Sequence, residues 1–189
     1  MKGRENIPQR GSVIIASNHL SYLDPPLLGW TVKRREIYFL AHEDLFHWKK
    51  GFSLLIRKYN AIPLKRKGFD RKAFRKAIGL IKKGEALVIF PEGGRSRIGR
   101  FLPPKPGLGL LALETHVPIL PVRIKGSDHS VGSLLFRRKR IWVHVGQPLT
   151  LKELDLLEPE GEVVMPYKER ALKISERIME RISELDFRN

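Results

Sequence analysis

A histidine and an aspartate that could act together lie in one short segment near the start of the chain. The segment reads Asn18-His19-Leu20-Ser21-Tyr22-Leu23-Asp24 and directly follows an apolar stretch. An aspartate can accept a hydrogen bond from one ring nitrogen of a histidine, fix its tautomer and leave the other nitrogen free as a general base. We therefore interpret His19 and Asp24 as a candidate dyad. Alternatively, Asp24 caps the helix that Pro25-Pro26 opens, and His19 is an ordinary loop residue.

A second polar segment also follows an apolar stretch and reads Phe90-Pro91-Glu92-Gly93-Gly94-Arg95-Ser96-Arg97. Its paired glycines can expose backbone N–H groups, and its two guanidinium groups can bind the oxygen atoms of a phosphate or of a developing oxyanion. A solvated connection between two elements is the alternative. The spacing matches neither a P-loop nor a dinucleotide-binding fingerprint, so the segment does not indicate nucleotide binding.

Two further segments carry weaker signals. Asn60-Ala61-Ile62-Pro63-Leu64-Lys65-Arg66 brings a strand end next to a cationic tip, where Arg66 could bind a phosphate through two parallel hydrogen bonds. Val117-Pro118-Ile119-Leu120-Pro121-Val122 is apolar and stiffened by its prolines. A buried position in a sheet is a sufficient explanation for this last segment.

The elements that must position these residues follow an α/β pattern. Short apolar runs that read as strands alternate with helix-like segments, which predicts a single domain with a mixed, largely parallel sheet flanked by helices. Near-continuous apolarity in the runs predicts burial on both faces of the sheet. The expected strands are residues 13–17, 38–41, 61–65, 86–90, 119–124 and 141–145.

Two amphipathic helices are expected. The first begins after Asp70 as N-cap and ends before Gly84, with one apolar face and one face of lysines and arginines. The second covers about 168–187 and places apolar residues at spacings of three and four. Residues 151–166 read as a loop or short helix that leads into it. No repeat or linker marks a second domain, so we expect one domain over 1–189, with the polar segments described above within about 12–124.

Composition narrows the function classes. The 189 residues include no cysteine, which excludes a disulfide framework, a thiol nucleophile and a cysteine-based metal site. No uncharged apolar run is long enough for a transmembrane helix, and the first ten residues lack the apolar core of a signal peptide. The net charge is +16, and the excess lies in residues 1–140. Such an excess indicates a polyanionic partner, either nucleic acid or an anionic bilayer surface; a basic surface that only aids solubility is the alternative.

The four segments, taken in order, resemble the glycerolipid acyltransferase family that contains bacterial 1-acyl-sn-glycerol-3-phosphate acyltransferase. The motifs N-H-x4-D, a strand ending in arginine, F-P-E-G-x-R-S and V-P-I-x-P-V span about residues 12–124. The resemblance implies a glycerol-3-phosphate acyltransferase-like fold and an acyl chain lying in an apolar groove or tunnel. It implies that His19 is the catalytic base with Asp24 as its partner and that Pro121 lies on the acyl-donor side. It implies that the acceptor is bound by Arg66, Glu92, Gly93, Gly94, Arg95 and Ser96.

This chain departs from the family pattern in three ways. Gly94 stands where a threonine is usual, which removes a hydroxyl group and keeps the turn. Asn60 and Pro63 replace the common glycine and phenylalanine of the second motif. Only about eleven residues precede the first strand, where family members usually carry apolar helical sequence.

The resemblance implies transfer of a fatty acyl group to the sn-2 hydroxyl of lysophosphatidic acid. The co-substrate is an acyl thioester of coenzyme A or acyl-carrier protein, and we expect no metal and no further cofactor. We expect peripheral attachment to the cytoplasmic face of an anionic membrane, through the basic face of the helix after Asp70 and an aromatic and cationic patch. That patch would comprise Trp30, Lys33, Arg34, Arg35, Phe46, Trp48, Lys49, Lys50 and Phe52.

Three alternatives remain open from the sequence. The first is an acyltransferase for another acceptor, such as glycerol 3-phosphate or a lysophospholipid. The second is a basic nucleic-acid-binding module, which accounts for the charge and for the run 137–140, but not for His19 with Asp24 or for the Glu92 segment. The third is a catalytically silent lipid-binding homologue, which the intact dyad disfavours. No nucleic acid partner is expected.

Overall fold

A six-stranded sheet forms the centre of the computed structural model, which describes residues 1–33, 35–47, 54, 56–66, 68–96, 98–128, 140–154 and 165–187. The strands are β1 (Val13–Ser17), β2 (Ile37–His42), β3 (Ala61–Leu64), β4 (Ala86–Ile89), β5 (Ile119–Lys125) and β6 (Trp142–Val145). Their order across the sheet is β3-β2-β4-β1-β5-β6. All neighbouring pairs are parallel except β5 with β6. The predicted α/β fold is confirmed, and each predicted strand is present to within one residue at either end.

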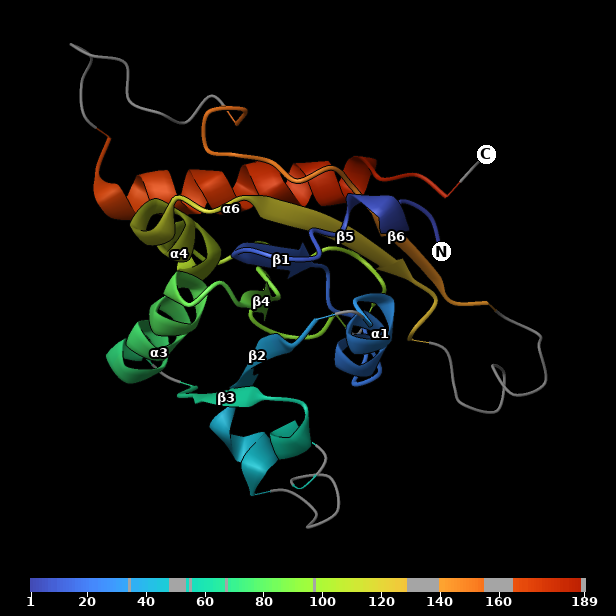
Figure 1. Ribbon diagram of the computed structural model, residues 1–189, viewed down its shortest axis with the longest axis horizontal. Helices are drawn as coiled ribbons and strands as arrows, with labels where there is room; N and C mark the ends of the chain where they lie inside the picture. The colour runs from blue at the N-terminus through green and yellow to red at the C-terminus, as the bar shows by residue number, and fades with distance from the viewer. Residues whose placement is uncertain are drawn as a thin grey trace.

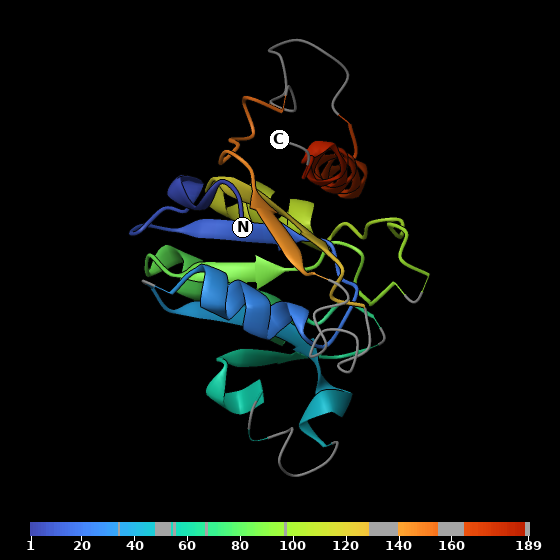
Figure 2. The same cartoon turned by 90° about the vertical axis from the view of Figure 1, so that its right-hand side faces the viewer.

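Helices cover both faces of this sheet (Figure 1). Helix α1 (Asp24–Thr31) packs on one face, and α3 (Arg71–Lys82), α4 (Gly107–Thr115) and α6 (Tyr167–Glu184) pack on the other. Two short 3-10 helices, η1 (Arg4–Asn6) and η2 (Glu43–Phe46), precede β1 and follow β2. Because β1 to β5 run in the same direction, their carboxyl ends meet at one edge of the sheet. The arrowheads of β1 and β4 in Figure 2 point toward this edge, which we call the carboxyl edge.

Burial on both faces is confirmed for the central strands and wrong for the outer ones. Every residue of β1 and of β4 is buried. In β2, β3 and β6, buried residues mix with partly or fully exposed ones. The difference follows from position, because β3 and β6 end the sheet and β2 lies next to the short β3, so helices cover them less completely.

The helix predicted after Asp70 begins and ends as expected. One carboxylate oxygen of Asp70 accepts hydrogen bonds from the backbone N–H groups of Lys72 and Ala73, which satisfies two donors of the first turn. The same carboxylate accepts from the N–H of Lys65, at 3.0 Å, and so ties the start of α3 to the end of β3. Gly84 follows the helix with a φ of +90°.

The last helix is shorter than the predicted span of about 168–187, because α6 ends at Glu184 and Leu185 is extended. Arg123 of β5 accounts for this end, since its guanidinium donates to the carbonyls of Ser183 and Leu185 at 2.7 and 2.9 Å. The expected loop at 151–166 lies largely outside the described residues. Among the residues that the structure describes, no helix is long and apolar enough to cross a bilayer.

Helices α4 and α6 touch at a glycine. Gly109 is buried, and a Cβ added there would overlap the carbonyl group of Ala171 in α6. The N–H of Gly109 donates to the Ser175 hydroxyl, which in turn donates to the Ala171 carbonyl, at 3.1 and 3.2 Å. The two helices therefore approach as closely as their backbones allow.

Gly109→Ala should lower the free energy of unfolding by about 3 kcal/mol or more, because the new methyl group has only backbone to displace. Urea denaturation measures the loss. Gly107→Ala is the matched control in the same helix: a Cβ there meets no atom within 4 Å. Its stability should change by less than about 1 kcal/mol. Equal stability of the two variants would contradict the close approach.

Candidate functional site

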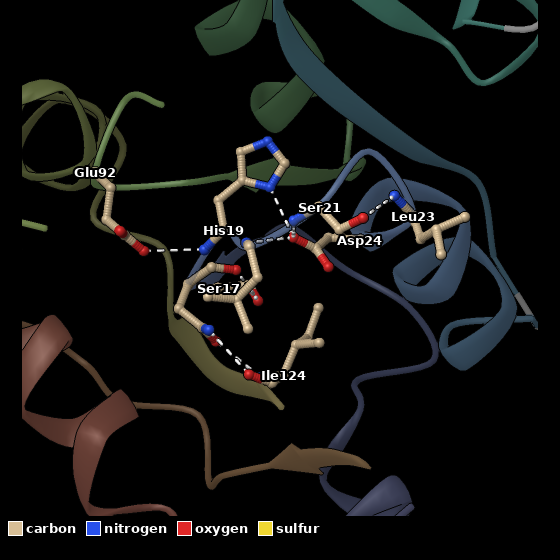
Figure 3. Close-up of polar contacts among 9 residues, drawn as sticks. Ser17, His19, Ser21, Leu23, Asp24, Glu92 and Ile124 are labelled. Atoms are coloured by element: carbon tan, nitrogen blue, oxygen red, sulfur yellow. Dashed lines mark hydrogen bonds and ion pairs between the residues drawn. The ribbon is translucent and has the colours of Figure 1, made fainter. Parts of the chain in front are cut away.

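The segment after β1 places His19 and Asp24 in direct contact. The Nδ1 atom of His19 lies 2.8 Å from Oδ2 of Asp24. The carboxylate can only accept, so Nδ1 carries the hydrogen and Nε2 carries the lone pair of a base. Figure 3 shows that the second ring nitrogen points away from Asp24. The dyad that the sequence predicts is thus present as a geometry.

Asp24 does more than orient the ring. Its Oδ2 also accepts hydrogen bonds from the backbone N–H groups of Leu20 and Ser21, at 2.7 and 2.8 Å (Figure 3). The residue is fully buried. The alternative that Asp24 caps the following helix is wrong, because Asp24 is the first residue of α1 and its carboxylate binds the loop before it. A buried carboxylate with three donors on one oxygen fixes the loop and the ring together.

Two contacts fix the His19 ring and its backbone to the rest of the sheet. The ring stacks on Phe90, with centroids 4.0 Å apart and planes 16° from parallel. Before it in the chain, the buried Asn18 side chain donates to the carbonyl of Ile124 and accepts from its N–H, at 2.9 and 2.8 Å. The side chain of His19 retains 15% exposure, so its outer face is open to a ligand.

Glu92 connects the dyad segment to the segment after β4. Its Oε1 accepts from the N–H of His19 at 2.9 Å (Figure 3), and its Oε2 accepts from the N–H of Leu102 at 3.0 Å. The residue is buried, and this burial raises the pKa of its carboxyl group, with the charge of Asp24 acting in the same direction. Because both of its carboxylate oxygens already accept from backbone N–H groups, Glu92 positions the two segments that form the site. Its implied role in acceptor binding stays a prediction.

The remaining residues of this segment lie close to His19. The N–H of Ser96 donates to the His19 carbonyl at 2.8 Å, and Ser96 is itself buried. The guanidinium of Arg95 lies over the ring of Tyr22, 3.5 Å from its centroid. The N–H of Gly93 donates to the carbonyl of Phe90, so Gly93 has no N–H left for an oxyanion. Arg97 lies outside the described residues.

Lys105 and His42 also lie beside Gly93, in the segment after β4, although no motif in the sequence includes them. Gly93 has a φ of +64°, and a Cβ there would lie 2.8 to 3.0 Å from the Cδ, Cε and Nζ atoms of Lys105. The backbone N–H of Lys105 donates to the Pro91 carbonyl. Nε2 of His42, at the end of β2, lies 3.2 Å from the Gly93 carbonyl. His42 meets Gly93 because β2 and β4 are neighbours in the sheet, whereas Lys105 lies in the same connection between β4 and α4 as Gly93, which folds back on itself.

Arg66 and Pro121 lie farther from the dyad. Arg66 follows β3, which lies three strand positions from β1 with β2 and β4 between them; this corresponds to roughly 14 Å at about 4.8 Å per strand. Its side chain is 74% exposed and pairs with Asp44 at 3.1 Å. Pro121 is buried in β5, with its ring beside Gly146. The roles that the resemblance implies for both residues stay predictions.

An open apolar groove lies beside α1, on the same face of the sheet as the His19 ring. Its volume is about 360 Å³. Trp30, at its rim, is 58% exposed and has the Lys33 ammonium 5.0 Å from its ring. In the aromatic and cationic patch expected from the sequence, Arg34, Trp48, Lys49, Lys50 and Phe52 lie outside the described residues. The groove is lined by Pro26, Gly29, Trp30, Ile37, Phe39, Lys58, Tyr59 and Asn60.

The raised pKa of Glu92 predicts a pH-dependent stability term. The folded protein takes up a proton at Glu92 at a higher pH than the unfolded chain does. Between these two pKa values the folded state binds more protons, so this term adds stability as pH falls. Glu92→Gln removes the term and turns an amide N–H₂ toward a backbone donor, which costs about 1–3 kcal/mol at neutral pH. Denaturation of both proteins across the acid range should show the loss growing as pH falls.

Glu43→Gln is the matched control, because Glu43 is an exposed carboxylate at the same edge of the sheet. It should leave the free energy of unfolding within about 0.5 kcal/mol of the original protein at each pH. A stability difference for Glu92→Gln that does not change with pH would contradict the effect of burial on this carboxyl group.

Comparison with known proteins identifies relatives of this chain. The profile of the Acyltransferase family matches residues 1–125. A 1-acyl-sn-glycerol-3-phosphate acyltransferase of Bacillus subtilis is 28% identical over 183 residues, which is 97% of this chain and 85% of that protein. The protein of the same name from Streptococcus pneumoniae is 28% identical over 159 residues, or 83% of this chain and 58% of its own length.

A solved structure is similar to this chain over its whole length. The crystal structure of the 1-acyl-sn-glycerophosphate (LPA) acyltransferase PlsC from Thermotoga maritima superposes with a TM-score of 0.69 at 29% identity, and covers all of this chain and 72% of that one. The matched profile spans both the dyad segment and the Glu92 segment, and the similar fold extends over the whole chain. The protein belongs to the acyltransferase family.

Proposed function

We propose that this protein transfers a fatty acyl group from an acyl thioester to the sn-2 hydroxyl of 1-acyl-glycerol-3-phosphate, giving phosphatidic acid. The observation that carries the proposal is the contact between His19 and Asp24 beside a loop with two cations, Arg95 and Lys105. The names of the bacterial relatives support the choice of acceptor.

His19 acts as the general base in the proposed reaction. Its Nε2 takes the proton of the acceptor hydroxyl as the oxygen attacks the thioester carbon and a C–O bond forms. Asp24 stabilises the imidazolium, and its two further backbone donors keep the carboxylate in place. When the tetrahedral intermediate collapses, the C–S bond breaks and the thiolate takes the proton from His19. General-base assistance of this kind contributes about 10²- to 10⁴-fold to the rate.

We assign the acceptor phosphate to Arg95 and Lys105. Two carbon atoms and one ester oxygen separate this phosphate from the reacting hydroxyl, so its cations must lie close to His19. Arg95 belongs to the loop that bonds to the His19 carbonyl through Ser96, and Lys105 crosses the same loop at Gly93. Arg66, three strand positions from β1 and paired with Asp44, acts on the phosphate at longer range. We assign the oxyanion of the tetrahedral intermediate to the N–H of Gly94, because the N–H of Gly93 already donates to the Phe90 carbonyl.

The apolar groove beside α1 suits an acyl chain. It begins at Pro26, two residues after Asp24, and continues along one face of α1 toward Tyr59. The donor in the proposal is a thioester of coenzyme A or acyl-carrier protein. Both are acidic molecules, which fits the basic surface of residues 1–140.

His19→Ala should reduce kcat by about 10²-fold or more while the protein stays folded, because the variant has no base for the hydroxyl proton. Acyl transfer is measured on vesicles with lysophosphatidic acid, glycerol 3-phosphate and a neutral lysolipid, each with both donors. Thermal unfolding checks the fold. Undiminished turnover by the variant would rule out the proposed base, and equal use of the neutral lysolipid would rule out the proposed acceptor.

Arg95→Ala and Lys105→Ala should each raise the KM for the acceptor by roughly tenfold or more, since each loses a charge-assisted contact with the phosphate. The KM for the donor should change less. Arg66→Ala should also affect the acceptor more than the donor, but by a smaller factor. Arg181, exposed on α6 and paired with Glu184, is the matched control. A larger effect at Arg66 than at Arg95 would overturn this placement of the phosphate.

A further inference from the structure

We infer that the carboxyl edge of the sheet is the surface by which this protein lies on an anionic lipid bilayer, with Phe69, Ile98 and Phe101 entering the lipid. The inference rests on the proposed function for one premise, namely that the acceptor is a lipid. The choice of this edge over the other surfaces rests on where exposed apolar side chains and cations lie.

Among the described residues, four large exposed side chains are made only of hydrocarbon, and three of them lie at the carboxyl edge; the fourth is Leu54, between η2 and β3. Phe69, between β3 and α3, is 59% exposed, although it also touches Phe74. Ile98 and Phe101, in the segment after β4, are 71% and 39% exposed. The segment that carries them is tied to the site, because the N–H of Leu102 donates to Glu92. Large apolar side chains held in water beside a binding site mark an interaction surface.

The opposite edge carries exposed rings of a different kind. Trp30 at the end of α1 has the Lys33 ammonium over its ring. Tyr167 at the start of α6 donates its hydroxyl to Glu114 at 2.7 Å. Both rings carry a polar group, and each has a local polar partner. Phe101 also has a cation near its ring, the Arg123 guanidinium 5.4 Å from its centroid, but neither Phe101 nor Phe69 nor Ile98 carries a polar group of its own.

Cations surround the apolar side chains at the carboxyl edge. Arg71 and Arg75 of α3 line a shallow depression of about 390 Å³ together with Phe69 and Phe74. Cations outnumber the acidic residues at this edge: Asp24 and Glu92 are buried, Asp70 caps α3 and Asp44 pairs with Arg66, while Glu43 and Asp128 are exposed. Apolar tips among long cationic side chains fit an anionic bilayer, where the tips enter the lipid and the cations meet the headgroups. The other cations of this edge are Lys65, Arg66, Lys72, Arg95, Arg100, Lys105 and Lys125.

This orientation brings the site to the lipid. His19 follows β1 at the same edge, and β4 and β5 flank β1 on either side. The acceptor can then present its headgroup to His19 while its acyl chain stays in the bilayer. The basic face of α3, expected from the sequence to contact the membrane along its length, would touch it mainly through its first two turns.

The first experiment compares two sets of substitutions in the full chain. Phe69→Ser, Ile98→Ser and Phe101→Ser are combined in one variant, and Trp30→Ser and Tyr167→Ser in the control. Binding is measured by co-sedimentation with vesicles of phosphatidylcholine, with and without phosphatidylglycerol. The carboxyl-edge variant should bind phosphatidylglycerol vesicles at least roughly tenfold more weakly, and the control within about twofold of the original protein. A loss confined to the control would overturn the inference.

The second experiment asks which edge enters the lipid. The chain has three tryptophans, and Trp142 pairs with Lys125 at the carboxyl edge while Trp30 lies at the opposite one. Variants that keep only one of these two tryptophans, with phenylalanine at the other positions, are mixed with vesicles containing brominated lipid. Emission from Trp142 should be quenched, and emission from Trp30 should not. Quenching of Trp30 alone would place the opposite edge on the bilayer.

A water-soluble assay separates this inference from the proposed function. Short-chain lysophosphatidic acid, present as monomers, needs no bilayer, so the carboxyl-edge variant should acylate it at the rate of the original protein. If the original protein acylates no acceptor, the proposed function fails and the vesicle measurements still test the surface. If the variant binds vesicles normally but loses turnover with acyl-carrier-protein thioester, the surface belongs to an acidic protein and the inference fails.

Discussion

A single oxygen atom of Asp24, Oδ2, holds the loop that carries His19, the proposed general base. Three N–H groups converge on it: the ring nitrogen of His19 and the backbones of Leu20 and Ser21. A buried carboxylate is tolerated only when hydrogen bonds replace its water. The loop must therefore wrap around Asp24 for the protein to fold, and the wrapped loop already has the histidine in place. The same carboxylate oxygen thus fixes the backbone of residues 20–21 and orients the His19 ring.

The rest of the sheet holds this loop at two points. Asn18 bonds to β5 through both atoms of its amide group, and Glu92 brings the segment after β4 against the backbone of His19. Strands β4 and β5 are the two neighbours of β1. The loop that carries His19 is therefore attached to both sides of β1, through Asn18 to β5 and through Glu92 to the segment after β4. The cations therefore differ in their distance from His19: Arg95 lies in the segment bonded to it, and Arg66 follows a strand three positions from β1.

Local patterns in the sequence were sufficient for much of the fold. The strand 13–17 agrees to the residue, and the helix after Asp70 begins and ends where its cap and Gly84 indicate. The contact between His19 and Asp24 was also predictable, because with only four residues between them a tight loop can bring the two side chains together. Each of these features depends on residues within a few positions of one another.

Features that depend on strand order were not predictable in the same way. Glu92 bonds to a residue 73 positions away, and Asn18 to one 106 positions away. His42 meets Gly93 only because β2 and β4 are neighbours. The last helix ends early for a similar reason, since Arg123 of β5 takes its final carbonyls. The outer strands are less buried than their apolar sequences suggest, because the order of strands decides which ones end the sheet.

The central position of β1 has a consequence for synthesis of the chain. β1 leaves the ribosome well before both strands that pair with it, which begin at Ala86 and at Ile119. At about 5–20 residues per second, an apolar strand and the base beside it wait roughly 5 to 20 s for their partners. His19 and Asp24 are therefore made well before the strands that anchor their segment, so nascent chains of this protein are candidates for protection by a chaperone.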